Sequence, residues 1–497
     1  MKYLTNKKKV KLNKNLLKIS IIAFLIPLLF YNCKKNSNDD NNTYNIIILY
    51  TNDEHGWIEK SDYTNGAANM MGLWIENEGY DGDDRYLILS GGDNWTGPAI
   101  STWFEGESTV DVMNAMEYDA STIGNHEFDF KVEGLYERIE QADFPFLSAN
   151  IREKTGGEIP DFATPYIIKD IDGIMVGIIG LTTTTTPYST FPDHVADYDF
   201  IDYATALEYI VPKVKEAGAE LLIVTGHICY SEIVALVPTL ADLGISVISG
   251  GHCHNDLVGE IINDIAVIKS SAYMQSYAKV EITYDKVEQE VVSMEPSVHL
   301  NENGNSDQTV SDVVSYWRMQ ADAELSEVIG YTDSEIIRES CTMHNMVVDS
   351  WLHQYPTADI AMTNAGGIRQ SIPAGNITKE VIIGVLPFQN FIIELQLTGA
   401  EVINCTGYAD MIYGGMTAIG GYFLLDGTEI DNNTTYSVLT TDYLYARNDY
   451  RFPFRQYDPS PYYTSMNYHQ PTIDWITSLN TSSSDPLDNY LDNTARR

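Results

Sequence analysis

The sequence predicts an α/β protein of two domains, and three observations support this prediction. At 497 residues the chain is too long for one ordinary hydrophobic core. An apolar fraction of 44% and an aromatic fraction of 11% are typical of a folded globular protein. From about residue 45 to 290, short β-rich runs alternate with segments of helical character. The runs hold four or five consecutive apolar residues, which indicates sheets covered by helices or by each other.

Residues 1–32 are expected to be an export signal rather than part of the fold. Seven lysines precede the apolar run ISIIAFLIPLLF, which is short for a membrane span. The run ends in FYNC, and Cys33 opens a polar tether, residues 33–44. FYNC resembles a loose bacterial lipobox, which implies a periplasmic or cell-surface lipoprotein with a lipid anchor at Cys33. Plain signal cleavage and a permanent anchor helix are the alternatives.

The charge of the chain excludes one class of partner. Removal of residues 1–32 leaves 23 basic and 70 acidic residues, a formal charge of −47 against −40 for the whole chain. Nucleic-acid polymers are therefore not expected as substrates, because their affinity comes largely from Lys and Arg contacts to phosphates. A small anion is not excluded, since bound cations reverse the local field of an acidic protein.

Four cysteines follow Cys33, namely Cys229, Cys253, Cys341 and Cys405. Their spacing shows no CxxC pattern and no disulfide framework. Isolated buried thiols are therefore expected, with Cys253 serving as a packing residue.

The domain limits follow from composition. The β-rich alternation places a first domain at residues 45–295. The polar stretch VHLNENGNSDQTVSD and the amphipathic helix predicted in DVVSYWRMQADAELSEVIG form a joint at 296–330. A second α/β domain with a Tyr-rich tail is expected at 331–485.

Five of the predicted strands end in Gly or another small residue followed by Asp, Asn or His. The motifs are TNDEHG, SGGD, GNHEFD, TGH and GGHCH, and their candidate residues are Asp53, His55, Asp93, Asn125, His126, His227, His252 and His254. Half of the ten histidines lie in these motifs. Since ligands of α/β proteins gather at the carboxyl ends of strands, we expect these side chains to share one crevice.

These residue types suit a pair of divalent ions. Two ions about 3.5–4 Å apart need a bridging carboxylate with neutral imidazoles and oxygens on each side, and they activate a bridging water for phosphoryl displacement. The two histidines of HCH point to one side because strand side chains alternate. A lone DxH is more often a turn and a lone GH a capping or core histidine, but the ordered set indicates a dinuclear centre. The mixed ligands suit Zn, Mn, Fe or Co.

The five motifs resemble those of the calcineurin-like metallophosphoesterases. The chain from about 45 to 480 resembles the bacterial 5′-nucleotidase and UDP-sugar hydrolase family. This resemblance implies an N-terminal calcineurin-like four-layer α/β/β/α sandwich and a second α/β substrate-binding domain. Domain rotation is also expected from the resemblance.

The resemblance implies a role for each candidate residue. One ion would be held by Asp53, His55, Asp93 and His254, and the second by Asp93, Asn125, His227 and His252. His126 would protonate or polarise the reacting oxygens, with its ring oriented by Asp129. Asn125 would also touch the phosphoryl group.

Two motifs of the second domain resemble the substrate-binding signature of the family, MTNAGGIRQSI and LPFQN. Gly367 lets the backbone approach a ligand, and Arg369 offers a planar fork for phosphate. Asn364 is expected to read a base edge and Phe388 to stack on a ring, although a core aromatic is the alternative for Phe388. Arg338 is a further candidate anion contact.

A later loop departs from the family pattern, which is roughly aromatic-Leu-Ala-x-Gly-Gly-Asp-Gly. The segment TTDYLYARNDYRFPF aligns Tyr443 with the aromatic residue and Asp449 with the acid. The glycines that flank the acid in the family pattern are replaced here by Arg447, Asn448 and Tyr450. Bulky side chains at these positions imply a reshaped pocket and leave nucleotide specificity open.

The sequence thus predicts an exported hydrolase that releases phosphate from nucleoside 5′-monophosphates or related small phosphoesters. The attacking group would be a hydroxide that bridges the two metal ions. Cyclic-nucleotide phosphodiesterases and nucleotide-sugar diphosphate hydrolases would share the same centre. A non-catalytic surface lipoprotein that binds a nucleotide or metal is the alternative of another class, and His126 with Asp129 argues against it because binding needs neither.

Overall fold

The structure, a computed structural model, describes residues 42–61, 63–254, 256–449 and 451–497. Residues 42–497 form one compact unit. The predicted export signal, Cys33 and Tyr450 lie outside the described residues. In the described ranges, no helix combines the length and the apolar character that a bilayer span requires.

Two six-stranded sheets build the region from 43 to 300. The first has the order β14-β13-β1-β2-β3-β4 and the second the order β11-β12-β10-β9-β7-β6. The first comprises β1 (Thr43–Thr51), β2 (Tyr86–Ser90), β3 (Ala120–Thr122), β4 (Phe146–Leu147), β13 (Ser276–Asp285) and β14 (Glu290–Leu300). The second comprises β6 (Tyr166–Ile171), β7 (Ile174–Leu181), β9 (Leu221–Gly226), β10 (Val247–Ser249), β11 (Val258–Ile262) and β12 (Ile265–Lys269). The pairs β1-β2-β3-β4 and β7-β9-β10-β12 are parallel, so their carboxyl ends coincide.

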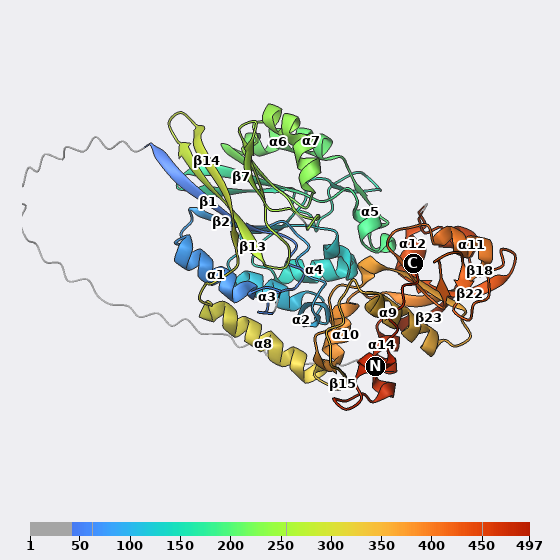
Figure 1. Cartoon of the computed structure of the whole chain (residues 1–497). Coiled ribbons are helices and arrows are strands. Elements are labelled where there is room, and N and C mark those ends of the chain that lie inside the picture. The colour runs from blue at the N-terminus through green and yellow to red at the C-terminus, as the bar shows by residue number, and fades with distance from the viewer. Residues whose placement is uncertain (1–41, 62, 255, 450) are drawn as a thin grey trace, which may run out of the picture. The chain divides into compact units, whose positions relative to one another are not determined.

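The two sheets pack face to face and helices cover their outer faces (Figure 1). Ile46, Ile48 and Tyr50 of β1 share a core with Ile223 of the second sheet, whereas Leu49 packs on the helix side, as strand alternation requires. The first sheet is covered by α1 (Gly66–Asn77), α3 (Glu107–Ala115), α4 (Lys131–Gln141) and α8 (Gln308–Leu325). The second is covered by α6 (Tyr203–Glu216) and α7 (Tyr230–Leu243). The expected four-layer α/β/β/α sandwich is confirmed.

A five-stranded sheet with the order β19-β16-β22-β18-β23 forms the second α/β region. Its strands are β16 (Ile360–Asn364), β18 (Phe391–Thr398), β19 (Met411–Gly414), β22 (Thr435–Thr441) and β23 (Tyr462–Asn467). One face packs on α9 (Cys341–Gln354), α10 (Lys379–Val385) and α14 (Gln470–Leu479), and the other on α11 (Gly399–Cys405) and α12 (Asp442–Arg447). Shorter elements are α2 (Ala99–Thr102), α5 (Thr186–Ser189), α13 (Phe454–Tyr457), β5 (Ile151–Glu153), β8 (Tyr198–Phe200), β15 (Val328–Thr332), β17 (Gly375–Thr378), β20 (Met416–Thr417) and β21 (Phe423–Leu424).

Helix α8 contacts both regions. Trp317 is buried and donates its indole N–H to Asp111 of α3 (3.1 Å). Arg318 pairs with Glu59 of the first region (3.2 Å) and with Glu380 of α10 (2.6 Å). The helix predicted from the amphipathic pattern is therefore present, and it joins the two α/β regions.

The expectation of isolated thiols is wrong for two of the four cysteines. Cys229 and Cys253 form a disulfide across a sequence separation of 24. The spacing could not reveal this pair, because the two loops meet only when the parallel neighbours β9 and β10 end side by side. Cys253 is thus cross-linked rather than a packing thiol, whereas Cys341 is free and exposed and Cys405 is free and buried.

Candidate metal centre and substrate cavity

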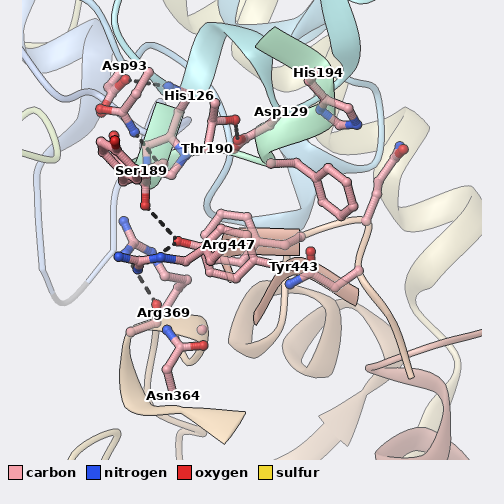
Figure 2. Close-up of a pocket in the computed structure, with 18 of the residues that line it drawn as sticks. Asp93, His126, Asp129, Ser189, Thr190, His194, Asn364, Arg369, Tyr443 and Arg447 are labelled. Atoms are coloured by element: carbon pink, nitrogen blue, oxygen red, sulfur yellow. Dashed lines mark hydrogen bonds and ion pairs between the residues drawn. The ribbon is translucent and has the colours of Figure 1, made fainter. Parts of the chain in front are cut away.

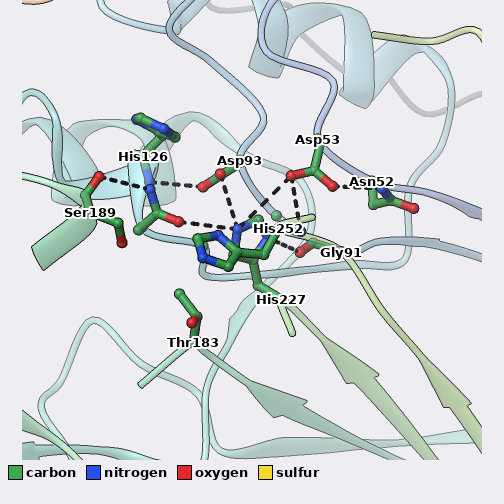
Figure 3. Close-up of polar contacts among 12 residues, drawn as sticks. Asn52, Asp53, Gly91, Asp93, His126, Thr183, Ser189, His227 and His252 are labelled. Carbon is green, nitrogen blue, oxygen red and sulfur yellow. Dashed lines mark hydrogen bonds and ion pairs between the residues drawn. The ribbon is translucent and has the colours of Figure 1, made fainter. Parts of the chain in front are cut away.

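The loops after β1, β2, β3, β9 and β10 bring all eight predicted strand-end residues to one place. Figure 3 shows five of them, Asp53, Asp93, His126, His227 and His252. Three overlapping groups have ligand atoms within 4.8 Å of one another: Asp53 with His55 and His254, His55 with Asp93 and His126, and Asp93 with His227 and His252. The amide oxygen of Asn125 lies 3.2 Å from Nε2 of His227. The parallel strands of the two sheets explain this gathering, since their carboxyl ends face the same crevice.

Four of these residues adopt a left-handed backbone conformation. The φ angles are 54° for Asp53, 46° for His55, 58° for Asp93 and 66° for His252. Such residues cost about 1–3 kcal/mol each and persist where the surroundings enforce them. Here the backbone N–H of His55 donates to the carbonyl of Asp93 (2.9 Å), and that of Asp53 donates to the carbonyl of Gly92 (3.0 Å). These bonds fasten the loop after β1 to the loop after β2.

Asp93 occupies the middle of the cluster. Its Oδ2 lies 3.0 Å from Nε2 of His227 and 3.9 Å from Nε2 of His55, which belong to different ligand groups. Its Oδ1 accepts the backbone N–H of His126 (2.8 Å). This position between the groups is the one that a bridging carboxylate requires.

The imidazoles are oriented by their outer nitrogens. His55 and His227 donate Nδ1–H to the backbone carbonyls of Thr96 (3.1 Å) and Gly91 (2.8 Å). The Nε2 lone pairs are thereby directed at the centre. Nε2 of His55 lies 3.3 Å from Nε2 of His254, close to the roughly 3.4 Å that separates two nitrogens on one tetrahedral ion.

The electrostatics of the centre favour bound positive charge. Burial raises the pKa of the Asp53 and Asp93 carboxyls, but His254 and His227 respectively outweigh it and hold both below their usual range. Burial alone lowers the pKa of His227, yet the adjacent Asp93 carboxylate outweighs it and raises the pKa to about 10. Two buried carboxylates faced by imidazole nitrogens and an amide oxygen are a donor set that fits divalent cations.

Two supporting residues were not found from the sequence. The buried carboxylate of Glu127 accepts the backbone N–H groups of Asp93 (2.9 Å) and Gly124 (2.6 Å), and burial raises its pKa to about 7. Asn52 donates its side-chain N–H to Oδ2 of Asp53 (2.6 Å). Glu127 lies in the motif GNHEFD and Asn52 in TNDEHG, and this position was the only sign of their role in the sequence. Their hydrogen-bond partners are known only from the fold.

His126 and Asp129 form the expected pair. Nδ1 of His126 lies 2.7 Å from Oδ2 of Asp129, and Thr190 donates its hydroxyl to Oδ1 of the same carboxylate (3.0 Å). Burial lowers the pKa of His126, but Asp129 and Asp93 outweigh it and raise the pKa above its ordinary value. Because Asp129 occupies Nδ1, Nε2 alone serves the cavity, where it can hold a proton or a cation but not both.

A cavity of about 310 Å³ extends from the ligand cluster to the second α/β region (Figure 2). Its lining includes Asp93, Asn125, His126, Asp129, His252 and His254, together with the predicted substrate residues Asn364, Gly367, Arg369, Phe388 and Tyr443. The rings of His126 and Phe388 are stacked with centroids 5.7 Å apart, and the guanidinium of Arg369 lies 5.6 Å from the Phe388 centroid. The chemistry-bearing residues of the two regions therefore share one cavity.

Two predicted substrate contacts do not reach this cavity. Asp449 pairs with Arg447 (2.9 Å) and Arg451 (3.3 Å), and Arg447 lines the cavity in its place. Arg338 lies beside Glu339 (3.7 Å) and outside the lining. Asp449 does not reach the cavity because its carboxylate pairs with Arg447, which stands two residues before it.

A segment without a predicted role, residues 188–194, also lines the cavity. The backbone carbonyl of Ser189 accepts the side-chain N–H of Asn125 (3.1 Å). The carbonyl of Tyr188 accepts the hydroxyl of Tyr443 (3.2 Å). This segment therefore orients one candidate metal ligand and one candidate aromatic contact, a role that its sequence YSTFPDH did not reveal.

The comparisons with known proteins agree with this geometry. Residues 325–404 match the family model described as 5′-nucleotidase, C-terminal domain. The human 5′-nucleotidase is 28% identical over 434 residues, covering 77% of this chain and 74% of that protein. The 5′-nucleotidase of Vibrio cholerae is 27% identical over 421 residues, covering 73% and 75%. The structure of a 5′-nucleotidase precursor from Thermus thermophilus matches with a TM-score of 0.75 and 20% identity, over 91% of this chain and 99% of that one, which shows a shared fold.

The similarity to 5′-nucleotidases, together with the ligand cluster of the sandwich, defines a metal-dependent phosphoester hydrolase. Enzymes of this type use two divalent metal ions as cofactors. Residues 325–404 match the C-terminal domain of 5′-nucleotidases, and about three quarters of the chain is similar to 5′-nucleotidases of human and bacterial origin.

Proposed function

We propose that this protein releases phosphate from nucleoside 5′-monophosphates. The observation that carries the proposal is the single cavity that joins the cluster around Asp93 to Arg369 and Phe388. A nucleotide needs positive charge at its phosphate and an aromatic surface at its base. The volume of about 310 Å³ lies in the range of small-ligand sites.

The metal ligands are proposed as the sequence motifs suggest. One ion is assigned to Asp53, His55, Asp93 and His254, and the other to Asp93, Asn125, His227 and His252. When bound, the two ions supply Lewis-acid charge to the phosphoryl oxygens and lower the pKa of a water molecule. The protein fixes the donors through the carbonyls that hold His55 and His227 and through the left-handed backbone at Asp53 and Asp93.

His126 is proposed to donate a proton or hydrogen bond from Nε2 to a reacting oxygen. Asp129 accepts from Nδ1 and thereby fixes the ring. Against the effect of burial, the carboxylates of Asp129 and Asp93 raise the pKa of His126 and thereby stabilise its protonated form. General acid help of this kind contributes roughly 10²–10⁴-fold to the rate.

The second α/β region is proposed to bind the rest of the substrate. Arg369 carries a guanidinium suited to the phosphate, and its place against Phe388 supports this role. Phe388 and Tyr443 offer ring faces to a base, and Asn364 offers an amide to its edge.

The test is a substrate panel with phosphate release as the readout. It comprises mononucleotides, cyclic nucleotides, nucleotide sugars, sugar phosphates and p-nitrophenyl phosphate, each with Mn²⁺ or Zn²⁺ and with a chelator. We expect chelator-sensitive turnover that is fastest with mononucleotides. Faster cleavage of cyclic nucleotides or nucleotide sugars would show that one of these is the substrate instead. Stoichiometric metal binding without any turnover would show that the protein binds metal but is not an enzyme.

We also propose export and lipid anchoring at Cys33. The disulfide between Cys229 and Cys253 supports an oxidising compartment, since disulfides are rare in reducing cytosol. Fractionation and mass spectrometry of the wild type and of Cys33→Ser test this. The wild type should carry a lipid on Cys33 and sediment with membranes, whereas an unmodified wild-type Cys33 refutes the anchor.

A further inference from the structure

Arg447 stands where the family pattern has a small residue, and the fold turns it into the cavity. It is the last residue of α12 and follows Tyr443 by four positions, so the two side chains lie on one helix face. Asn448, with a φ of 40°, ends the helix in the left-handed conformation. The Arg447 side chain is only 10% exposed and lines the cavity beside Tyr443.

Two hydrogen bonds engage the terminal nitrogens of Arg447 and leave its Nε–H without an acceptor in the described part of the chain. Its Nη1 donates to the hydroxyl of Tyr443 (3.3 Å) and its Nη2 to Asp449 (2.9 Å). Its Nε–H is buried and has no hydrogen-bond partner among the residues that the structure describes. A guanidinium carries five N–H donors and no acceptor, so the Nε–H can be satisfied only by a hydrogen-bond acceptor. Burial of such a donor without a partner is unfavourable.

Arg447 already faces one carboxylate and one hydroxyl. The carboxylate, that of Asp449, is shared with Arg451. The hydroxyl of Tyr443 accepts from Arg447 and donates to the carbonyl of Tyr188 (3.2 Å), so its own proton is engaged. In Figure 2, Arg447 and Tyr443 lie together across the cavity from Asp93, where the phosphate belongs under the proposed function.

We infer that Arg447 is a specificity-determining residue that reads an oxygen acceptor on the base, so that 6-oxopurine nucleotides are preferred to adenine nucleotides. The inference rests on the proposed function. A 6-oxopurine presents O6 and N7 as adjacent acceptors, which match an arginine, whereas adenine places an amino donor at position 6. If the amino group of adenine faces Arg447, two hydrogen-bond donors meet, and neither the amino group nor the Arg447 N–H finds an acceptor.

The experiment compares IMP with AMP, which differ in the oxo or amino group at position 6 of the purine and in the proton that IMP carries at N1. kcat/KM is measured for both with the metal-loaded wild type, Arg447→Met and the control Arg451→Met. Arg451 also pairs with Asp449 but lies outside the cavity lining. The wild type should prefer IMP by roughly tenfold, within the range for good arginine contacts to a base edge. Arg447→Met should reduce this ratio to about twofold or less, and Arg451→Met should keep it.

Each outcome decides the inference. Equal kcat/KM for IMP and AMP in the wild type overturns it while the proposed function stands. Equal losses for both substrates in Arg447→Met also overturn it, because a purely structural role leaves the ratio unchanged. If Arg447→Met does not fold, the ratio of kcat/KM for IMP to that for AMP is measured with Arg447→Lys. This variant keeps the charge but loses the planar fork, so the preference for IMP should also be lower. Turnover of p-nitrophenyl phosphate without turnover of either nucleotide rejects the proposed function and the inference together.

Discussion

Removal of the disulfide is expected to weaken both the fold and the metal centre. The bond between Cys229 and Cys253 closes a loop with a sequence separation of 24. The chain-entropy relation for a loop of this length predicts a loss of about 3.5 kcal/mol in the free energy of unfolding when the link is cut. The double variant Cys229→Ser/Cys253→Ser should therefore unfold at clearly lower urea concentration than the wild type.

The metal centre should respond because of where the bond lies. Cys253 stands between His252 and His254, and Cys229 stands two residues after His227 and is the N-cap of α7. The disulfide thus ties together loops that carry three candidate ligands. Loss of support around a ligand typically lowers metal affinity by about 10–100-fold, so the double variant should release metal at a correspondingly lower chelator concentration.

The assay has an internal control in Cys341, which is free and exposed. Urea unfolding of the metal-free wild type, the double variant and Cys341→Ser gives the stability, and elemental analysis after dialysis against a chelator gives metal retention. Dithiothreitol should destabilise the wild type and leave the double variant unchanged. The reasoning is refuted if the double variant matches the wild type in both measurements, or if Cys341→Ser shows the same losses.

Three further changes have expected outcomes. His126→Ala should lower kcat by roughly 10²–10⁴-fold and retain metal by elemental analysis, and Asp129→Asn should do so less severely; loss of the metal along with activity would show that His126 is a ligand instead. Glu127→Ala leaves three buried backbone N–H groups without their acceptor, so urea unfolding should show a loss of at least about 3 kcal/mol, and an unchanged midpoint would contradict this. Burial lowers the pKa of His469 from 6.5 to about 4, so only the unfolded chain takes up this proton as the pH falls through that window. Stability should therefore decline by up to about 3 kcal/mol from pH 6.5 to pH 4, and His469→Gln should flatten that decline in urea titrations; parallel curves would count against it.

Much of the catalytic region could be predicted because its information is local. Apolar runs that end in TNDEHG, SGGD, GNHEFD, TGH and GGHCH indicated strands with polar side chains at their carboxyl ends. Parallel strands place such ends at one edge of a sheet, so the gathering of Asp53, Asp93 and Asn125 after neighbouring strands of the first sheet follows from the pattern. His227 joins them because the second sheet packs on the first. The pair His126 and Asp129 is local as well, since the two residues stand three positions apart in one turn.

The remaining features depend on which loops meet in space. The partners of Cys229 and of Glu127 come from other strands, and no spacing along the chain encodes their distance. Arg447 rather than Asp449 lines the cavity, and the carboxylate of Asp449 pairs with Arg447 and Arg451 instead. The sequence by itself determined the chemistry of the centre through residue types at strand ends. Only the tertiary structure decided the cross-link, the buried supports and the shape of the substrate cavity, because these arise where distant segments pack together.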